Sequence, residues 1–159
     1  MVKRAWLFFA IFLSGCATYQ SLPVSDIRIS IGSFANLTYA SGITAVLKKK
    51  LAEEASSWGI KVGPAERVLS GEITEIDYQP LFYGEDKKIV GLKAKIKVKV
   101  KMRERGKTVW DKEFQEEVVS FPQGSWKEPR KELLERLCKR VAQKIIFYLR
   151  YEQSNRHLR

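Results

Sequence analysis

The chain has 159 residues, of which 29 are Lys or Arg and 18 are Asp or Glu, so its formal charge at neutral pH is +11. This length allows one real hydrophobic core and excludes two, while 45% hydrophobic and 11% aromatic residues fit a globular fold. The positive surplus favours an anionic partner, with nucleic acid as the first class to weigh.

The N-terminus has the organisation of an exported precursor. Lys3 and Arg4 precede an apolar run at residues 5–13, which is too short for a bilayer-spanning helix of about 20 residues. A charged segment followed by such a run is typical of a secretory signal peptide. The sequence LSGC at 13–16 follows at once and resembles a bacterial lipobox, so we predict that Cys16 is acylated and becomes the new N-terminus.

The alternatives for this segment are an ordinary signal peptide and a buried apolar segment with an incidental cysteine. Charge, length, small residues and cysteine occur in the lipobox order, which favours lipidation. Residues 1–15 would then be removed, and residues 16–25 would link the lipid to the domain. Export argues against a nucleic-acid partner, and the abundant anions of a bacterial envelope are phospholipid headgroups and lipopolysaccharide.

The second cysteine and the single histidine do not predict a disulfide, a reactive thiol or a zinc site. If Cys16 bears lipid, Cys138 has no partner for an intramolecular disulfide. Cys138 lies in a helical apolar pattern, which predicts a small buried hydrophobe rather than a reactive thiol. His157 is in a polar tail, and no zinc-ligand spacing exists.

The first half of the domain changes from a strand pattern to a helical one. Residues 26–34 alternate apolar and polar side chains, which predicts a half-buried strand. From about Ser41 apolar residues recur at helical spacing, and Gly59 is a plausible C-terminal stop.

The next segment, residues 65–80, predicts a second strand whose alternation is imperfect. A bulge near Thr74 and Glu75 would reconcile its two halves. We expect Pro80 to end the strand and residues 81–88 to form a hairpin loop with an aromatic shoulder and two lysines.

Residues 91–106 give the clearest strand pattern. Its apolar positions are Leu92, Ala94, Ile96, Val98, Val100 and Met102. Its basic positions are Lys93, Lys95, Lys97, Lys99, Lys101 and Arg103. After a tight turn, residues 108–121 return as a fourth strand. Carboxylates on the second and fourth strands can offset part of this lysine row by cross-strand pairing.

The last element is a long helix within residues 122–151. Ser125 and Glu128 have the spacing of a capping box at its start. Residues 152–159 show no apolar periodicity, so we expect a disordered tail.

The element order is strand, helix, three strands, helix. It predicts a single α+β domain over residues 26–151, a two-layer sandwich with a four-stranded, mostly antiparallel sheet. Both helices would cover one face of the sheet, and the lysine-bearing face would stay open.

Several segments in this order resemble the LPS-assembly lipoprotein (LptE) family, and the resemblance spans nearly the whole mature chain. They are the lipobox with Tyr19 after it, "IRISIGSFANLT" running into "GITAVLKKKLAEE", "VLSGEITEIDYQPLFYG", "GLKAKIKVKVKMRE" and "GKTVWDKEF". The basic strand is the departure, since it carries more lysines than the family pattern leads us to expect.

The resemblance implies a function and a location. Family members sit as a plug in the lumen of the outer-membrane β-barrel LptD, and the pair carries lipopolysaccharide to the outer leaflet. Ala17, after the predicted lipidated cysteine, is consistent with sorting to the outer membrane, on its periplasmic side. Members also bind lipopolysaccharide through basic residues near one end of the sheet, which by position are Lys87, Lys88 and Lys127 here.

Other residues are candidates for partner contact. Phe82 and Tyr83 flank the expected hairpin loop. Lys93, Lys95, Lys97 and Lys99 either face a partner or form a solvated face that discourages aggregation. For Lys87, Lys88 and Lys127, the alternative to lipopolysaccharide binding is that each lysine only keeps its loop soluble.

We expect no enzyme, because the chain has no nucleophile motif, no metal cluster and no phosphate-cradling glycine loop. No cofactor is expected beyond the covalent lipid at Cys16. One alternative function is an accessory lipoprotein of an ABC-type envelope lipid transporter, and another is an unattached lipoprotein that binds anionic glycans.

Replacing Cys16 by Ser should release the protein from membranes, because the acyl chains would have no attachment point. The measurement is the fraction that pellets with envelope membranes after a high-salt wash. A variant that still pellets in high salt would contradict lipidation.

Overall fold

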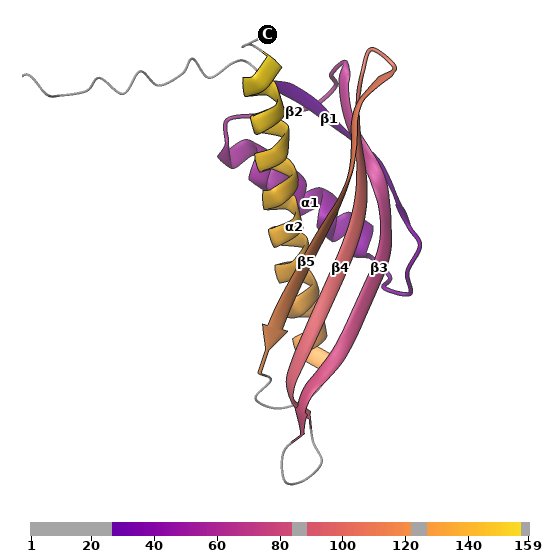
Figure 1. Ribbon diagram of the computed structural model, residues 1–159, viewed down its shortest axis with the longest axis vertical. Helices are drawn as coiled ribbons and strands as arrows, with labels where there is room; N and C mark the ends of the chain where they lie inside the picture. The colour runs from indigo at the N-terminus through magenta and orange to yellow at the C-terminus, as the bar shows by residue number, and fades with distance from the viewer. Residues whose placement is uncertain (1–26, 84–88, 122–126, 157–159) are drawn as a thin grey trace, which may run out of the picture.

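The computed structural model describes residues 27–83, 89–121 and 127–156. Two helices lie on one side of a long, curved sheet (Figure 1). The strands are β1 (Arg28–Asn36), β2 (Lys61–Val62), β3 (Arg67–Tyr83), β4 (Ile89–Glu104) and β5 (Lys107–Ser120), and the helices are α1 (Ile43–Ser57) and α2 (Lys127–Arg156). The two-layer α+β class predicted from the sequence is therefore confirmed.

The sheet differs from the expected one in strand number and direction. It has five strands in the order β2-β1-β3-β4-β5, and β1 runs parallel to both of its neighbours. The prediction of four mostly antiparallel strands was wrong because α1 is a crossover connection that returns the chain in the same direction. The fifth strand, β2, has only two residues, so it shows no periodicity in the sequence. It is joined to the start of β1 by a hydrogen bond that Lys61 N donates to the Ile27 carbonyl oxygen at 2.8 Å.

Strand β3 contains the predicted bulge and extends beyond its predicted end. Its register with β4 shifts between Ile73 and Glu75, which confirms the bulge. The expectation that Pro80 ends the strand was wrong, because pairing with β4 continues to Tyr83. Strand β1 pairs with β3 only as far as Ile73, so Pro80 lies in an edge segment, where its missing N–H costs no ladder bond.

The core lies between the sheet and the two helices. All six predicted apolar positions of β4 are buried. Opposite them lie buried residues of α1, such as Leu47 and Leu51, and of α2, such as Leu137 and Ile145. Cys138 is fully buried in the same cluster, and burial raises the pKa of its thiol to about 12, so it packs as a hydrophobe.

Helix α1 ends where the sequence predicts, whereas helix α2 is longer than predicted. Helix α1 stops as predicted, since Gly59 has a φ of 73°, a left-handed conformation suited to a helix terminus. Helix α2 continues to Arg156, five residues past the expected domain end, and Tyr148 Oη donates to Glu152 Oε1 at 2.7 Å. Ser125 lies outside the described residues.

Gly71 should not tolerate a side chain, because a Cβ there would overlap the Lys99 carbonyl oxygen and lie 3.0 Å from the Phe34 ring. We expect Gly71→Ala to lower the free energy of unfolding by about 1–3 kcal/mol. Gly63→Ala is the matched control, because no atom lies within 4 Å of its added Cβ. Urea denaturation measures both, and equal stabilities would contradict this packing.

Candidate functional site

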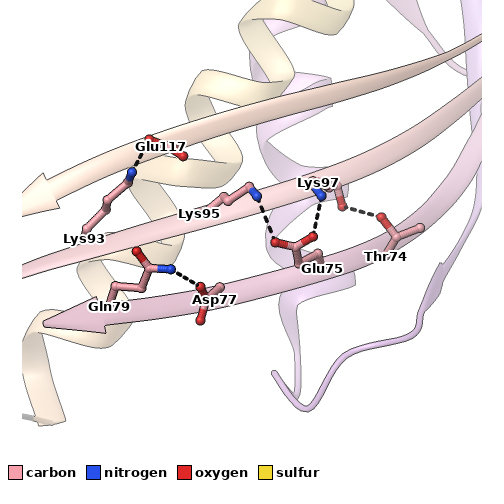
Figure 2. A network of polar contacts seen from close by, with 8 residues as sticks. All are labelled: Thr74, Glu75, Asp77, Gln79, Lys93, Lys95, Lys97 and Glu117. Atoms are coloured by element: carbon pink, nitrogen blue, oxygen red, sulfur yellow. Dashed lines mark hydrogen bonds and ion pairs between the residues drawn. The ribbon is translucent and has the colours of Figure 1, made fainter.

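The open face of the sheet carries a lattice of ion pairs between neighbouring strands. Figure 2 shows Glu75 held between two lysines of β4, with Oε1 at 3.0 Å from Lys95 Nζ and Oε2 at 2.6 Å from Lys97 Nζ. Lys93 Nζ lies 2.7 Å from Glu117 Oε2 on β5. Further along β4 the pairs are Lys99–Glu72 at 3.7 Å and Lys101–Asp111 at 3.3 Å.

The bulge in β3 is what brings Glu75 into this lattice. Ile73 is buried toward the helices, so an unbroken strand would also turn Glu75 toward them. The one-residue shift instead places Glu75 opposite Lys97 and Ile76 opposite Ile96. The inserted residue, Thr74, donates its hydroxyl to the Lys97 carbonyl oxygen at 3.4 Å (Figure 2).

These contacts cancel most of the positive charge that the lysine row brings to the open face. On this face the six basic residues of β4 stand beside six carboxylates of β3 and β5, which are Glu72, Glu75, Asp77, Asp111, Glu113 and Glu117. The hydrogen bond with Glu75 raises the pKa of Lys97, and the hydrogen bond from Lys97 lowers the pKa of Glu75. The face is therefore charged but balanced, whereas the sequence pattern alone suggested a basic face. That Lys93, Lys95, Lys97 and Lys99 face a partner stays a prediction.

The second candidate surface is an exposed apolar tip at one end of the long strands. It consists of Leu81, Phe82, Tyr83, Val119 and Phe121, which are all exposed. Phe82 and Phe121 stack with ring centroids 6.4 Å apart and planes 16° apart. Both rings lie over Gly91, where a Cβ would come within 2.8 Å of Phe82. The tip is at the opposite end of the long axis from the start of β1 (Figure 1).

The expected lipopolysaccharide-binding lysines flank this tip in the chain. Lys87, Lys88 and the lipidation site Cys16 lie outside the described residues. Lys127 is the first residue of α2, and its side chain is not described. The ends of β3 and β5, which precede the expected loops, lie with the start of α2 at one end of the molecule (Figure 1).

Phe82 and Tyr83 lie in β3 rather than in the loop where the sequence pattern placed them. The structure adds Phe121 to the same surface, a residue that the sequence analysis did not select. Its only sequence signal is an aromatic residue directly before a proline at the end of a strand.

Neither a metal-binding cluster nor a membrane-spanning helix is found in the part of the chain that the structure describes. No group of three or more His, Cys, Asp or Glu side chains there could hold a metal ion. No helix there is long and apolar enough to cross a bilayer.

Comparison with known proteins identifies the family. The model of the LptE lipopolysaccharide-assembly family matches residues 28–149, from the start of β1 nearly to the end of α2. The chain belongs to the LptE family. No curated protein sequence matches this LptE-family chain.

Solved structures share the fold of this LptE-family chain at low sequence identity. The minor lipoprotein of Acinetobacter baumannii has a TM-score of 0.57 at 11% identity, covering 80% of this chain and 95% of its own. Rare lipoprotein B of Shewanella oneidensis has a TM-score of 0.57 at 12% identity, with 82% and 98% covered. The PelC dodecamer of Paraburkholderia phytofirmans has a TM-score of 0.51 at 16% identity, with 77% and 87% covered. These likenesses concern the fold alone.

The ion-pair lattice predicts that the pKa of Glu75 is lowered. Because its folded-state pKa is lowered by Lys97 and Lys95, the pairs stabilise the fold above the unfolded-state pKa, and this contribution is lost as pH falls through the folded-state pKa. We expect an NMR titration of the Glu75 carboxyl carbon to give a midpoint below the ordinary 4.5.

The matched variants are Lys97→Met and Lys107→Met, which remove the same charge. The first should move the Glu75 midpoint back toward 4.5, and the second should leave it in place because Lys107 lies in the β4–β5 turn region, away from Glu75. An unshifted midpoint in the unmodified protein would mean that the lattice does not hold in solution.

Proposed function

We propose that this LptE-family protein is a lipid-anchored plug of the outer-membrane β-barrel LptD, which inserts lipopolysaccharide into the outer leaflet. In this proposal it supports assembly of the barrel and binds lipopolysaccharide at the apolar tip. The role is non-enzymatic. The observation that carries the binding part is the exposed, stacked aromatic tip. In the chain, Lys87 and Lys88 follow Tyr83 of the tip closely, and Lys127 follows Phe121.

The chemistry of the tip suits an amphiphilic, phosphorylated ligand. Phe82, Tyr83 and Phe121 are 57%, 64% and 65% exposed, a costly arrangement unless a partner covers them. Lysines in the adjoining loops can contact phosphates by charge-assisted hydrogen bonds. Apolar rings beside cations match a lipid that carries acyl chains and phosphates on one headgroup.

The open sheet face supports the plug part of the proposal. A barrel lumen is polar and wet, so an inserted protein needs a surface without uncompensated charge that still tolerates water. The lattice formed by Lys93, Lys95, Lys97 and their carboxylates meets both conditions. Under the proposal this face, with Lys99, Phe82 and Tyr83, contacts the barrel.

The predicted lipid at Cys16 would hold the protein at the periplasmic side of the outer membrane and raise its local concentration near the barrel. An accessory lipoprotein of an ABC-type lipid transporter would share the anchor. Only the plug should be recovered in a one-to-one complex with a large outer-membrane barrel.

Reversing the charge of the three candidate lysines should weaken lipopolysaccharide binding. For Lys87→Glu/Lys88→Glu/Lys127→Glu we expect an affinity loss on the order of a hundredfold, from about 1 kcal/mol for each lysine near an anionic lipid surface. Binding to immobilised lipopolysaccharide at fixed ionic strength measures the loss.

The matched control is Arg28→Glu/Lys49→Glu/Lys107→Glu, three exposed cations that belong to other parts of the molecule. It changes the net charge equally and should reduce binding only slightly. Equal losses in both variants would show that binding follows net charge and would remove the tip from the account.

A further inference from the structure

The surplus positive charge of the described domain is concentrated on helix α2. This helix carries nine basic and four acidic residues, in contrast to the balanced long strands. Between residues 136 and 151 it has five basic residues and no acidic one. The basic positions are Arg136, Lys139, Arg140, Lys144 and Arg150.

These five cations are exposed and lie along one face of the helix. They recur at intervals of three, one, four and six residues, and together with Phe147 and Tyr151 they occupy an arc that faces away from the core. Phe147 is 61% and Tyr151 is 55% exposed. We call this set of seven residues the α2 stripe.

Little of the charge in the α2 stripe is neutralised within the domain. Among the described residues, only Lys144 has a carboxylate within ion-pair distance, that of Glu116. Arg140 Nη1 donates to the Glu117 carbonyl oxygen at 3.2 Å, which leaves its charge uncompensated. The Arg150 guanidinium lies 4.9 Å from the centroid of the Trp58 ring, a cation–π contact that also keeps the charge.

An apolar groove adjoins the α2 stripe. It has a volume of about 480 Å³ and is lined by Trp58, Phe114, Phe147 and Tyr148, with polar side chains at its margin. Trp58 and Phe147 meet edge to face with centroids 6.4 Å apart. The surface therefore combines cations with partly exposed aromatic rings, the composition of helices that lie in a membrane interface.

We propose that the α2 stripe binds the surface of an anionic phospholipid membrane, with Phe147 and Tyr151 at the depth of the headgroups. The cations are spread along about 22 Å of a convex helix and do not converge on one point, so they fit an array of phosphates rather than a single small anion. Charge complementarity with anionic headgroups supplies the attraction.

The position of the predicted anchor favours a membrane over an acidic protein as the occupant. The start of β1 and the end of α2 lie at the same end of the long axis (Figure 1). If Cys16 carries lipid, at most eleven residues separate the bilayer from residue 27, a reach of about 40 Å. When the protein is outside the barrel lumen, the stripe can therefore contact the membrane that holds the anchor.

Vesicle binding tests the proposal without the anchor, the barrel or lipopolysaccharide. Within the part of the chain that the structure describes, the buried core residues lie between Ile29 and Leu149. A chain of residues 17–159 keeps all of them, and its cooperative thermal unfolding checks that it folds. It should co-sediment with vesicles of phosphatidylglycerol and phosphatidylcholine, and much less with phosphatidylcholine alone. Added salt should weaken binding by screening.

Two variants with equal net charge locate the contact. Arg136→Gln/Lys139→Gln/Arg150→Gln should lower the partition coefficient on the order of a hundredfold. Lys93→Gln/Lys99→Gln/Lys101→Gln removes three charges from the open sheet face and should keep binding within about threefold of the unmodified chain. Phe147→Ser/Tyr151→Ser should lower the partition coefficient about tenfold through lost apolar burial.

Equal losses in the two charge variants, or an α2 variant that binds like the unmodified chain, would overturn the proposal. If the α2 variant keeps vesicle binding but no longer retains a barrel from detergent-solubilised envelope, the stripe is a protein interface and the lipid proposal fails. Because this test uses neither lipopolysaccharide nor the tip, its failure would leave the proposed function standing, and the reverse also holds.

Discussion

Strand β4 must satisfy two opposite environments, because every second side chain is apolar and the others are basic. Its apolar row is removed from water only if helices cover one face of the sheet. Its basic row can pack at about 4.8 Å strand spacing without repulsion only if carboxylates stand on both neighbouring strands. Both conditions are met, by α1 and α2 on one side and by Glu72, Glu75, Asp111 and Glu117 on the other.

The pairing of the β4 lysines with carboxylates determines which surfaces of the protein can attract anions. The ion pairs of the open face are partly exposed and add little net stability, but they remove the positive field that the lysine row would otherwise project. Among the described residues, what remains unbalanced is the α2 stripe, while Lys87 and Lys88 share their loop with Glu85 and Asp86. A protein with a large positive surplus thus has two separate candidate surfaces for anionic lipids, at different parts of its long axis.

Much of this fold can be predicted from the sequence, because β4 and the two helices have strong periodicity. The bulge at Thr74 was also predictable, since the apolar parity of β3 changes there. The parallel pairing of β1 was not predicted, although the strand–helix–strand order allows a crossover connection. Strand β2 has too few residues to show a pattern. The continuation of β3 past Pro80 could not be predicted, because it requires knowing that this segment is at the edge of the sheet. The aromatic tip could not be predicted either, because it requires knowing the three-dimensional arrangement of the strands. Phe82 and Phe121 meet only because β3 and β5 end together on either side of Gly91.

The central claim is that the open face is charge-balanced and that lipopolysaccharide meets the protein at the tip. Photo-crosslinking in living cells tests it most directly, with a photoreactive phenylalanine analogue placed at Phe82, Phe121 or Lys97 in turn. We predict lipopolysaccharide adducts from Phe82 and Phe121 and none from Lys97, the centre of the lattice. Adducts from Lys97 with none from the tip would contradict the account.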